Sequence, residues 1–393
     1  MTYTIELSTL SYILLVVFIL AGGAYCVWQW RRARRLEQFI ASENEREYLP
    51  DEQLPAVSVL VYAHNDADFL GRMLPLLLHQ EYPNYEVIVT DDASSDMTKN
   101  LLSDMLMHYD NLRTTFVPEG SRSLSRKKLS IMLGIKAAKN DVIVTVNANC
   151  RVMSEHWLRL IARNFVHGVD VVLGYSHYRY RRDRKLGRFY RIFDTVSTGA
   201  QYMLSAIAGT PYRGTSDNLA YRKHVFFDNT GFSRSLDLRW GDDDVYVSEI
   251  AHSGNTRVEL LPDSVVTAYY DNVAYAHHAL KLRRDFTSRF VSTRKPFVVQ
   301  GLMSCLLYAA HLAAAAAVAL NWRNVVVISV VAVLLIVMWV MMSVAVKRQC
   351  RALDSPTLAF SVPFHALWRP WVNLLYRIRG ARSRRSNYTG IVD

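Results

Sequence analysis

Apolar residues dominate three long stretches of the chain, Leu10–Trp28, Phe297–Leu320 and Val325–Val346. A helix of about 20 apolar residues is long enough to cross a bilayer, so each stretch is predicted to be a transmembrane helix. The first stretch resembles a secretory signal in its position. In such a signal, however, the positive charges precede the apolar part. Here four arginines follow it, within residues 31–35. We therefore predict an uncleaved membrane anchor.

Positively charged residues lie at one end of each apolar stretch. Arg294 and Lys295 precede the second stretch, and Lys347, Arg348 and Arg351 follow the third. Because cytoplasmic flanks carry the excess of lysine and arginine, the N-terminus is predicted outside and the long polar middle of the chain inside. The expected location is the inner membrane of a bacterium. His311, inside the second stretch, is expected to pack between helices, with a functional site as the alternative.

A fourth apolar segment, 357–379, has a different character. Two prolines and three arginines interrupt its aromatic residues. This composition is typical of a segment that lies in the cytoplasmic interface and does not cross the membrane. The basic tail that follows, with Arg382, Arg384 and Arg385, suits anionic membrane lipids.

Between the anchors, strand-like and helix-like patterns alternate. The alternation predicts an α/β fold with a mostly parallel sheet and helices on both faces. Polar clusters at 64–66, 91–96 and 147–149 follow predicted strands, at the ends where such sheets bind ligands. The predicted strands are Val57–Tyr62, Glu86–Thr90, Leu112–Val117, Val142–Val146 and Val169–Gly174, and two of the predicted helices are Lys127–Ala138 and Ser154–Phe165.

The predicted organisation has five parts, which differ in hydropathy and charge. They are an N-terminal anchor (1–36), a linker (37–55), a soluble domain (56–289), two transmembrane helices (290–355) and an interfacial segment with a basic tail (356–393).

Composition narrows the classes of protein. Hydrophobic residues make up 51% and charged residues 21%, which excludes a disordered chain. The net charge of +11 indicates an anionic partner, which could be a lipid, a nucleotide-linked substrate or nucleic acid. The four cysteines form no CxxC pair and no cluster with histidine, so neither a disulfide framework nor a zinc site is expected.

Two acidic clusters are candidates for chemistry. Asp91 and Asp92 end a predicted strand and favour contact with a ligand, whereas Asp96 is expected to cap a helix. Asp242, Asp243 and Asp244 are consecutive and cannot all be helix caps. A general base is the functional interpretation of this second cluster, and a solvated helix start is the alternative.

Three basic segments have more than one interpretation. Segment 121–128 could hold a diphosphate or form a solvated loop. Segment 178–188 carries six basic residues among tyrosines, which suits lipid headgroups, with nucleic acid or a solvated loop as alternatives. Lys281, Arg283, Arg284 and Arg289 lie just before the second apolar stretch and are interpreted in the same way.

From about Ala56 to Arg289 the chain resembles the family-2 glycosyltransferases, and its membrane flanks resemble the membrane-bound branch of that family. The motifs that carry the resemblance are Val57-Ser58-Val59-Leu60-Val61 with His64-Asn65-Asp66, the stretch 79–89 followed by Asp91-Asp92-Ala93-Ser94-Ser95-Asp96, Asn218-Leu219-Ala220-Tyr221-Arg222-Lys223, and Gly241-Asp242-Asp243-Asp244.

The resemblance implies a GT-A fold, a nucleotide-sugar donor, a lipid-linked or glycan acceptor, and inversion at the transferred sugar. It also implies Mg²⁺ or Mn²⁺ on the donor diphosphate. The implied roles are donor binding by Asp66, Asp91, Asp92, Lys127 and Lys128, base catalysis by Asp243 or its neighbour Asp242, and contact with the acceptor or the diphosphate by Asp244, Lys281, Arg283 and Arg284.

The sequence departs from the family pattern at three places. Asn147-Ala148-Asn149 stands at the metal-binding DXD position, Asp217 stands where an arginine is expected, and the segment 277–284 lacks the expected tryptophan. Neutral amides are weaker ligands than carboxylates for Mg²⁺ and Mn²⁺, so a metal at residues 147–149 is in doubt.

Two hypotheses follow from these departures. One is an active transferase in which Lys127, Lys128 or Arg283 supplies the positive charge at the diphosphate. The other is a catalytically weak subunit that binds a nucleotide, a lipid, a partner transferase or an export protein. The retained Asp243 favours the enzyme, and no nucleic-acid partner is expected.

Overall fold

The computed structural model describes residues 8–47, 49–120, 125–179, 187–358 and 360–382. The chain forms two compact units. The first comprises residues 1–39, 189–200 and 294–375, and the second comprises residues 40–188, 201–293 and 376–393.

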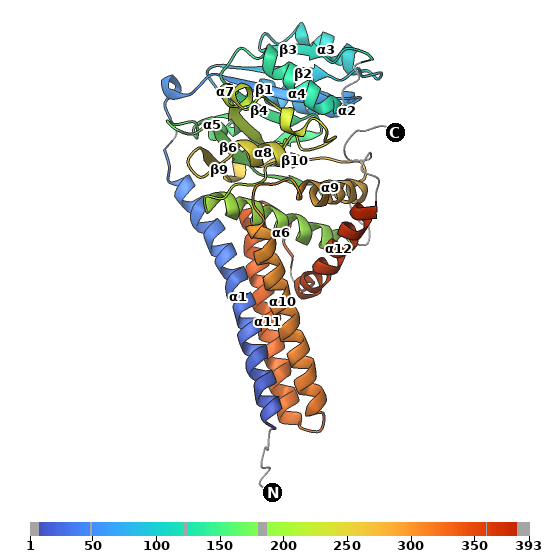
Figure 1. Cartoon of the computed structure of the whole chain (residues 1–393). Helices are drawn as coiled ribbons and strands as arrows, with labels where there is room; N and C mark the ends of the chain where they lie inside the picture. The colour runs from blue at the N-terminus through green and yellow to red at the C-terminus, as the bar shows by residue number, and fades with distance from the viewer. Residues whose placement is uncertain (1–7, 48, 121–124, 180–186, 359, 383–393) are drawn as a thin grey trace. The chain divides into compact units, whose positions relative to one another are not determined.

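Within the described residues, a seven-stranded sheet forms the centre of the second unit (Figure 1). Strand β8 is antiparallel to both of its neighbours, and the other adjacent pairs are parallel. This arrangement confirms the predicted α/β class with a mostly parallel sheet. In spatial order the strands are β3 (Leu112–Phe116), β2 (Tyr85–Asp91), β1 (Val57–Ala63), β4 (Val142–Asn147), β8 (Leu219–Arg222), β6 (Val171–Gly174) and β9 (Thr256–Glu259).

Strands β1, β2 and β4 form because their sequences are mostly apolar and buried, whereas the edge strand β3 is largely polar. Val57, Val59, Leu60 and Val61 of β1 are all buried, as expected of a parallel strand covered on both faces. Parallel neighbours need crossover connections, which the helices provide. These are α2 (Ala67–Leu78) after β1, α3 (Thr98–Leu106) after β2 and α4 (Arg126–Ala137) after β3.

The strand order places a ligand crevice beside β1. From β1 the chain proceeds outward through β2 and β3 on one side, while β4 lies on the other side. Such a reversal of strand order is the position where α/β sheets bind ligands, beyond the carboxyl ends of the strands. In the register of the sheet, Tyr62 is opposite Asn147, and Ala63 is opposite Asp91.

In the second half of this unit the sequence pattern predicted only β6 and helix α5 (Trp157–Ala162), which lies within the predicted helix Ser154–Phe165. It did not predict β8 or a separate three-stranded sheet of β5 (Cys150–Val152), β10 (Val266–Ala268) and β7 (Ser176–Tyr178). It also did not predict the helices α7 (Lys223–Asp228), α8 (Asp244–Ile250) and α9 (Val273–Thr287).

Asn218 joins these parts of the second unit. Its amide nitrogen donates to the backbone oxygens of Tyr175 (3.0 Å) and Ser264 (2.8 Å), and its amide oxygen accepts from Trp157 Nε1 at 3.2 Å. A side chain at Gly174 would place its Cβ 2.3 Å from Asn218 Cγ. Glycine at 174 is therefore required by the close approach of Asn218.

Part of the predicted linker is helical. Helix α1 (Thr9–Asn44) continues well past the apolar stretch. Arg163 holds the chain around its end, because its guanidinium donates to the backbone oxygens of Glu43 (3.2 Å) and Arg46 (3.3 Å). The same guanidinium pairs with the buried Glu259 at 3.1 Å. These contacts order residues that the composition alone assigned to a linker.

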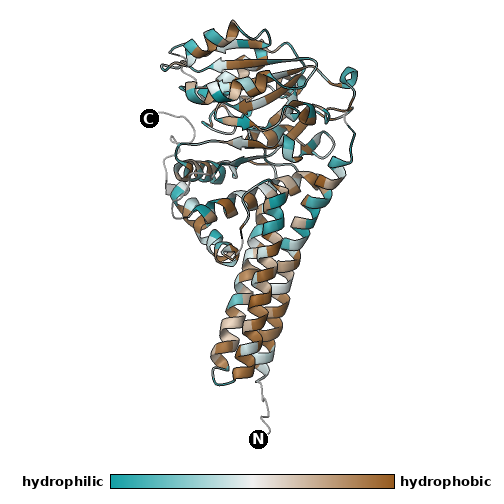
Figure 2. Ribbon diagram, turned by 180° about the vertical axis from the view of Figure 1, so that it is seen from behind, coloured by the Kyte–Doolittle hydropathy of each residue, from teal (hydrophilic) through white to brown (hydrophobic). Residues whose placement is uncertain are grey.

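The first unit contains three helices that are long and apolar enough to cross a membrane, found among the described residues. They are α1, α10 (Lys295–Leu320) and α11 (Val325–Ala352), and they include the three predicted apolar stretches. Figure 1 shows the three helices side by side, and Figure 2 shows their predominantly hydrophobic colouring. At a rise of about 1.5 Å per residue, each exceeds the roughly 30 Å of a hydrocarbon core.

A few polar contacts lie between these apolar helices. Gln349 Nε2 donates to Gln29 Oε1 at 3.2 Å, and both side chains are buried. Trp339 Nε1 donates to His311 Nε2 at 3.1 Å, and the two rings are stacked. His311 Nδ1 also contacts the backbone oxygen of Leu307 at 2.8 Å. These contacts favour the packing interpretation of His311.

Helix α12 (Val362–Arg382) contains most of the predicted interfacial segment. It is not among the candidate spans found in the described part of the chain. Arg369 of α12 donates to Asp194 Oδ1 (2.7 Å) and Thr198 Oγ1 (3.0 Å), which lie on α6 (Arg188–Ile207). Since Arg369 and Asp194 are both buried, this ion pair fixes α12 within the first unit.

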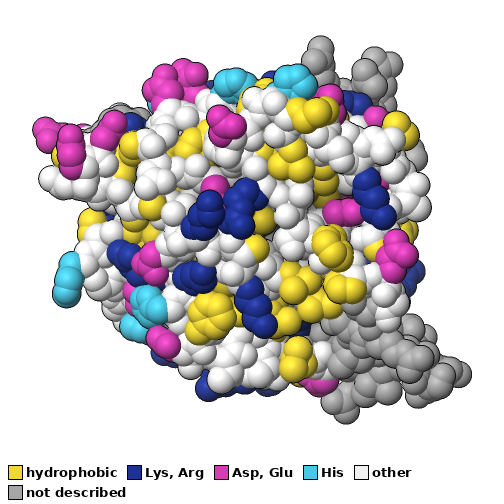
Figure 3. Space-filling view, turned by 90° about the horizontal axis from the view of Figure 1, so that it is seen from above, with side chains coloured by type: hydrophobic (Ala, Val, Ile, Leu, Met, Phe, Trp, Pro, Cys, Tyr) yellow, Lys and Arg dark blue, Asp and Glu magenta, His cyan; other side chains and the backbone are white. Residues whose placement is uncertain are grey.

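Charged side chains of both signs are mixed on the face shown in Figure 3. Lysine and arginine side chains lie near acidic ones there, with hydrophobic side chains between them. A mixed surface of this kind produces no strong field of one sign.

Asn218→Ala is expected to lower the stability of the second unit. The substitution leaves the buried Trp157 Nε1 and the carbonyl oxygen of Ser264 without their partner, at a cost of about 1–3 kcal/mol for each unsatisfied group, whereas the carbonyl oxygen of Tyr175 still accepts from the backbone nitrogen of Val266. Thermal unfolding of the detergent-purified protein should show a lower Tm. The exposed Asn100→Ala is the control and should change Tm little; equal effects of the two substitutions would contradict the role of Asn218.

Candidate active site

Asp92 directly follows β2 and is part of the candidate site. It is 2% exposed, and its Oδ1 accepts from Arg126 Nε (2.7 Å) and Nη2 (2.6 Å). Its Oδ2 accepts from the hydroxyl of Tyr62 at 2.9 Å. Burial, together with the charge of Asp92, raises the pKa of Tyr62, so this hydroxyl stays protonated and donates. Asp92 is thus a fixed carboxylate at the edge of the sheet.

Asn65 connects the loops that follow β1 and β2. Its backbone is left-handed (φ 56°), which asparagine tolerates better than most residues. Its Oδ1 accepts from the backbone nitrogen of Ser95 at 2.8 Å, and its own backbone nitrogen donates to Ser94 Oγ at 2.9 Å. The neighbouring Asp66 accepts from the backbone nitrogen of His64 at 2.9 Å, and burial raises the pKa of Asp66.

Asp91 turns toward its own loop. Its Oδ1 accepts from the backbone nitrogen of Ser94 at 3.1 Å, and the side chain is 6% exposed. The two loops therefore bring the predicted donor residues Asp66, Asp91 and Asp92 to one edge of the sheet. Their contact with a nucleotide stays a prediction.

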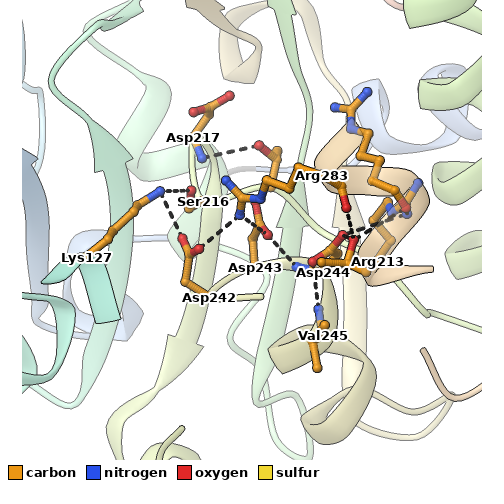
Figure 4. A network of polar contacts seen from close by, with 12 residues as sticks. Lys127, Arg213, Ser216, Asp217, Asp242, Asp243, Asp244, Val245 and Arg283 are labelled. Carbon is orange, nitrogen blue, oxygen red and sulfur yellow. Dashed lines mark hydrogen bonds and ion pairs between the residues drawn. The ribbon is translucent and has the colours of Figure 1, made fainter. Parts of the chain in front are cut away.

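Lys127 lies at one side of the polar network in Figure 4. Its ammonium donates to Ser216 Oγ at 2.7 Å and pairs with Asp242 Oδ2 at 2.9 Å. Lys127 comes from α4, whereas Ser216 lies in the loop before β8 and Asp242 lies just before α8. One cation thereby links three parts of the second unit.

Arg283 of α9 neutralises two of the three consecutive aspartates. Its Nη2 donates to Asp242 Oδ1 (2.9 Å) and Asp243 Oδ1 (2.5 Å), as Figure 4 shows. Burial alone would raise the pKa of Asp242, but Lys127 and Arg283 hold that pKa well below its usual range. Asp242 is consequently a buried, ionised group with two cationic partners.

Asp244 has a separate set of partners. Its Oδ2 accepts from Thr287 Oγ1 and lies 3.7 Å from Arg213 Nη2, and its Oδ1 accepts from the backbone nitrogen of Val245 at 2.9 Å. Burial, and then the adjacent charge of Asp243, raise the pKa of Asp244 to about 6. These contacts place Asp244 inside the protein, away from any open surface.

Asp243 is the most accessible of the three aspartates. Its side chain is 14% exposed, against 1% for Asp242 and 3% for Asp244. Its Oδ1 accepts from Arg283 and from the backbone nitrogen of Asp244, which begins α8. Its Oδ2 accepts no hydrogen bond from the described residues. The predicted role of Asp243 as a general base stays a prediction.

Gly241 permits this arrangement of acids. Its backbone is left-handed (φ 102°), and a Cβ there would lie 2.9 Å from Val245 Cγ2. Only glycine therefore allows the chain to turn sharply into the three aspartates.

Lys128 is directed away from the network. It is 2% exposed and donates to Ser235 O (2.5 Å), Ser235 Oγ (3.1 Å) and Leu238 O (3.0 Å). Burial lowers the pKa of Lys128 to about 8. An ammonium has three N–H groups, and all three have partners here. Lys128 thus holds the loop before the aspartates, and this geometry gives no support to its predicted contact with the donor.

Two predicted basic residues lie outside the network. The ammonium of Lys281 lies 5.6 Å from the ring centre of Tyr376. Arg284 contributes its backbone oxygen, which accepts from Arg213 Nη2 at 3.2 Å. Of the three basic residues predicted on the acceptor or diphosphate side, Arg283 is the one that contacts the aspartates.

The DXD position lies beside the network. Asn147 Nδ2 donates to Asp217 Oδ1 (2.5 Å) and to Ser216 Oγ (3.3 Å), and Asn149 Nδ2 donates to the backbone oxygen of Tyr269 at 3.0 Å. Two neutral amides, each with its nitrogen already bonded, do not by themselves make a divalent-metal site. One group of potential metal ligands found in the described residues, Glu81, Glu155 and His156, lies elsewhere and is largely exposed.

Several predicted features lie outside the described residues. They include residues 121–124 of the first basic segment, 180–186 of the second, and Arg384 and Arg385 of the tail.

The structure adds residues that the sequence pattern did not single out. They are Arg126 on Asp92, Ser216 on Lys127, and Arg213 and Thr287 on Asp244. Their own neighbours in sequence give little signal, because each becomes important only through a partner that is distant along the chain.

A mostly parallel sheet with acidic residues at its strand ends, which the chain extends through the antiparallel strand β8, is typical of a GT-A fold. A mannosyltransferase from Pyrobaculum calidifontis, solved with GDP-Man and Mn²⁺, has a similar fold, with a TM-score of 0.55 and 19% sequence identity. The similarity covers 93% of this chain and 99% of that one.

Sequence comparisons agree with the fold. Residues 58–236 match the sequence model described as glycosyl transferase family 2. A beta-monoglucosyldiacylglycerol synthase of Trichormus variabilis is 30% identical over 123 residues, which are 30% of this chain and 26% of that protein. The glycosyltransferase AglE of Haloferax volcanii is 26% identical over 194 residues, or 48% and 60% of the two chains.

Residues 58–236 thus match glycosyltransferase family 2; they lie in the second unit except for residues 189–200, which belong to the first. The matched segments are parts of the two curated relatives, since the chain spans 26% of one and 60% of the other.

Asp244→Asn is expected to change how stability depends on pH. The Asp244 carboxyl keeps its proton to about pH 6 in the folded protein but loses it near 3.8, its ordinary value, when unfolded. Between these pH values the folded state binds more protons, so the contribution of Asp244 to stability falls as pH rises from about 4 to 6. The variant cannot titrate there, so its Tm should fall less than that of the wild type. The difference corresponds to roughly 3 kcal/mol.

The measurement is thermal unfolding between pH 4 and 7, with the exposed Asp263→Asn as the control. Parallel profiles of Tm against pH for Asp244→Asn and the wild type would contradict the assignment.

Proposed function

We propose that this protein transfers a sugar from a nucleotide-sugar donor to a lipid-linked or glycan acceptor, with inversion at the sugar carbon. The observation that carries the proposal is Asp243. It is the accessible member of an otherwise buried and neutralised acidic cluster, and its Oδ2 accepts no hydrogen bond from the described residues. A carboxylate in this state suits the removal of a proton from an acceptor hydroxyl.

The proposed reaction is a single displacement. Asp243 Oδ2 takes the proton of the acceptor hydroxyl, and the acceptor oxygen forms a bond to the anomeric carbon. The bond from that carbon to the diphosphate oxygen breaks, and its electron pair leaves with the nucleoside diphosphate. Attack on the face opposite the leaving group inverts the configuration.

The loops after β1 and β2 are proposed to hold the nucleotide. Asp92 is fixed by Arg126 and Tyr62, so its position does not depend on the ligand. Asp66 lies in the adjacent loop, which Asn65 joins to the loop of Asp92. The mannosyltransferase of similar fold was solved with GDP-Man, which agrees with a nucleoside diphosphate sugar as the class of donor.

A cavity within the first unit supports a lipid-linked acceptor. Its volume is about 520 Å³, and its lining is mostly aromatic, with Tyr308, His311, Phe364, His365, Trp368 and Trp371. Such a lining suits an acyl or isoprenoid chain. The name of the Trichormus relative, a glucosyldiacylglycerol synthase, agrees with a lipid acceptor. We place the protein in the inner membrane of a bacterium, with the second unit in the cytoplasm, where it would serve synthesis of cell-envelope glycans.

Titration calorimetry of the detergent-purified protein with UDP and with GDP tests the donor class. Binding of either nucleotide supports the proposal and selects the nucleotide sugars for a transfer assay. Absence of binding to both would instead favour the alternative, a subunit that acts on a partner transferase or export protein.

Asp243→Asn is expected to lower kcat for sugar transfer by about 10²–10⁴-fold, the usual contribution of a general base. Asparagine retains an oxygen to cap α8 but cannot take a proton, so nucleotide affinity should stay within about twofold of the wild type. Steady-state transfer rates and calorimetry check the two parts separately. A variant that transfers sugar at the wild-type rate would show that Asp243 is not the base.

A further inference from the structure

Asp217 is a buried acid without a cationic partner. It is 8% exposed, its Oδ1 accepts from Asn147 Nδ2 at 2.5 Å, and its Oδ2 accepts from Ser176 Oγ at 2.9 Å. No lysine, arginine or histidine among the described residues lies within ion-pair distance of it. A buried carboxylate is costly unless a cation compensates its charge, so the position requires an explanation.

The nearest cations of the network are already engaged. Lys127 contacts Ser216, the residue before Asp217, but its ion-pair partner is Asp242. Figure 4 shows the carboxylate of Asp217 directed away from Lys127 and the three aspartates. The network itself balances three carboxylates (Asp242, Asp243 and Asp244) with three cations, which are Lys127, Arg213 and Arg283. It has no cation to spare for Asp217 or for a diphosphate.

Asn147 lies beside Asp217 and has a side-chain oxygen that is open to a ligand. Its amide nitrogen donates to Asp217, which orients the side chain, and its Oδ1 accepts no hydrogen bond from the described residues. Asn147 ends β4 opposite Tyr62, at the reversal of strand order, and Asp217 lies just before the neighbouring strand β8. The side chains of Asp217 and Asn147 are thus in direct contact at the carboxyl edge of the sheet, where the ligand crevice is expected.

We propose that Asp217, together with Asn147 Oδ1, forms a divalent-metal site that is completed by the donor diphosphate. The proposal rests on the proposed function, because the diphosphate supplies the remaining ligands. Mg²⁺ commonly binds through one or two carboxylates plus substrate phosphates, so a single protein acid is sufficient. The acid of the site would then come from the residue before β8, and the amides at 147 and 149 would not exclude a metal.

The arrangement also accounts for two departures from the family pattern together. An arginine at 217 would place a cation against the metal, whereas Asp217 supplies the negative charge that Asn147 lacks. The two substitutions compensate each other in charge and are in direct contact.

The test is calorimetry of UDP and GDP with and without Mn²⁺, combined with electron paramagnetic resonance of Mn²⁺ to count bound metal. For the wild type, Mn²⁺ should strengthen nucleotide binding at least about tenfold, an effect of the size that loss of a metal contact produces. In Asp217→Asn this enhancement and the bound Mn²⁺ signal should disappear, while binding of nucleotide without metal should persist. That persistence also shows that the variant folds.

Two further variants sharpen the test. The exposed Asp263→Asn should behave as the wild type, whereas Asn147→Asp should bind Mn²⁺ more tightly because it adds a carboxylate beside Asp217. Nucleotide binding that ignores Mn²⁺ in the wild type, or an enhancement that survives in Asp217→Asn, would overturn the metal site and leave the proposed function standing. Absence of all nucleotide binding would overturn both.

Discussion

The ion pairs between Arg283 and its two aspartates are the interaction on which the site depends. Three consecutive acids at the start of a helix repel one another, and burial increases the cost of each charge. The guanidinium of Arg283 forms ion pairs with both Asp242 and Asp243. Lys127, on a different helix, forms an ion pair with Asp242. Because α9 supplies Arg283 and α4 supplies Lys127, the acidic turn can form only when the second unit is assembled. Asp243 remains the member with an oxygen to spare.

The sequence predicted the first half of the sheet well because its information is local. The apolar run of β1 is buried on both faces, and the polar turn after it marks the strand end. Asp92 was predicted at such an end and lies there, next to β1 through the pairing of Ala63 with Asp91. The three apolar stretches were equally clear, because about 20 apolar residues suffice to identify each.

The rest depends on partners that are distant along the chain. Strand β8 has four residues, too few to show whether it pairs parallel or antiparallel. Lys127 and Lys128 are adjacent, and both were predicted to bind the donor. The helix, however, turns about 100° between them. One therefore contacts Asp242 and the other the loop at Ser235. In the sequence, Asp217 was visible only as a departure from the family motif. Its contact with Asn147 becomes apparent only when β4 and β8 are paired in the sheet.

The buried amides of Gln29 and Gln349 have a consequence for how the membrane unit is made. Both amides are buried at the ends of the apolar stretches, and a buried amide without a partner is costly, so the bond from Gln349 Nε2 to Gln29 Oε1 favours one particular height at which α1 and α11 meet. Helix α1 is synthesised first, and its partner emerges more than 300 residues later. Helix α1 thus contributes more than apolar length, because another apolar helix of equal length would leave Gln349 without this partner.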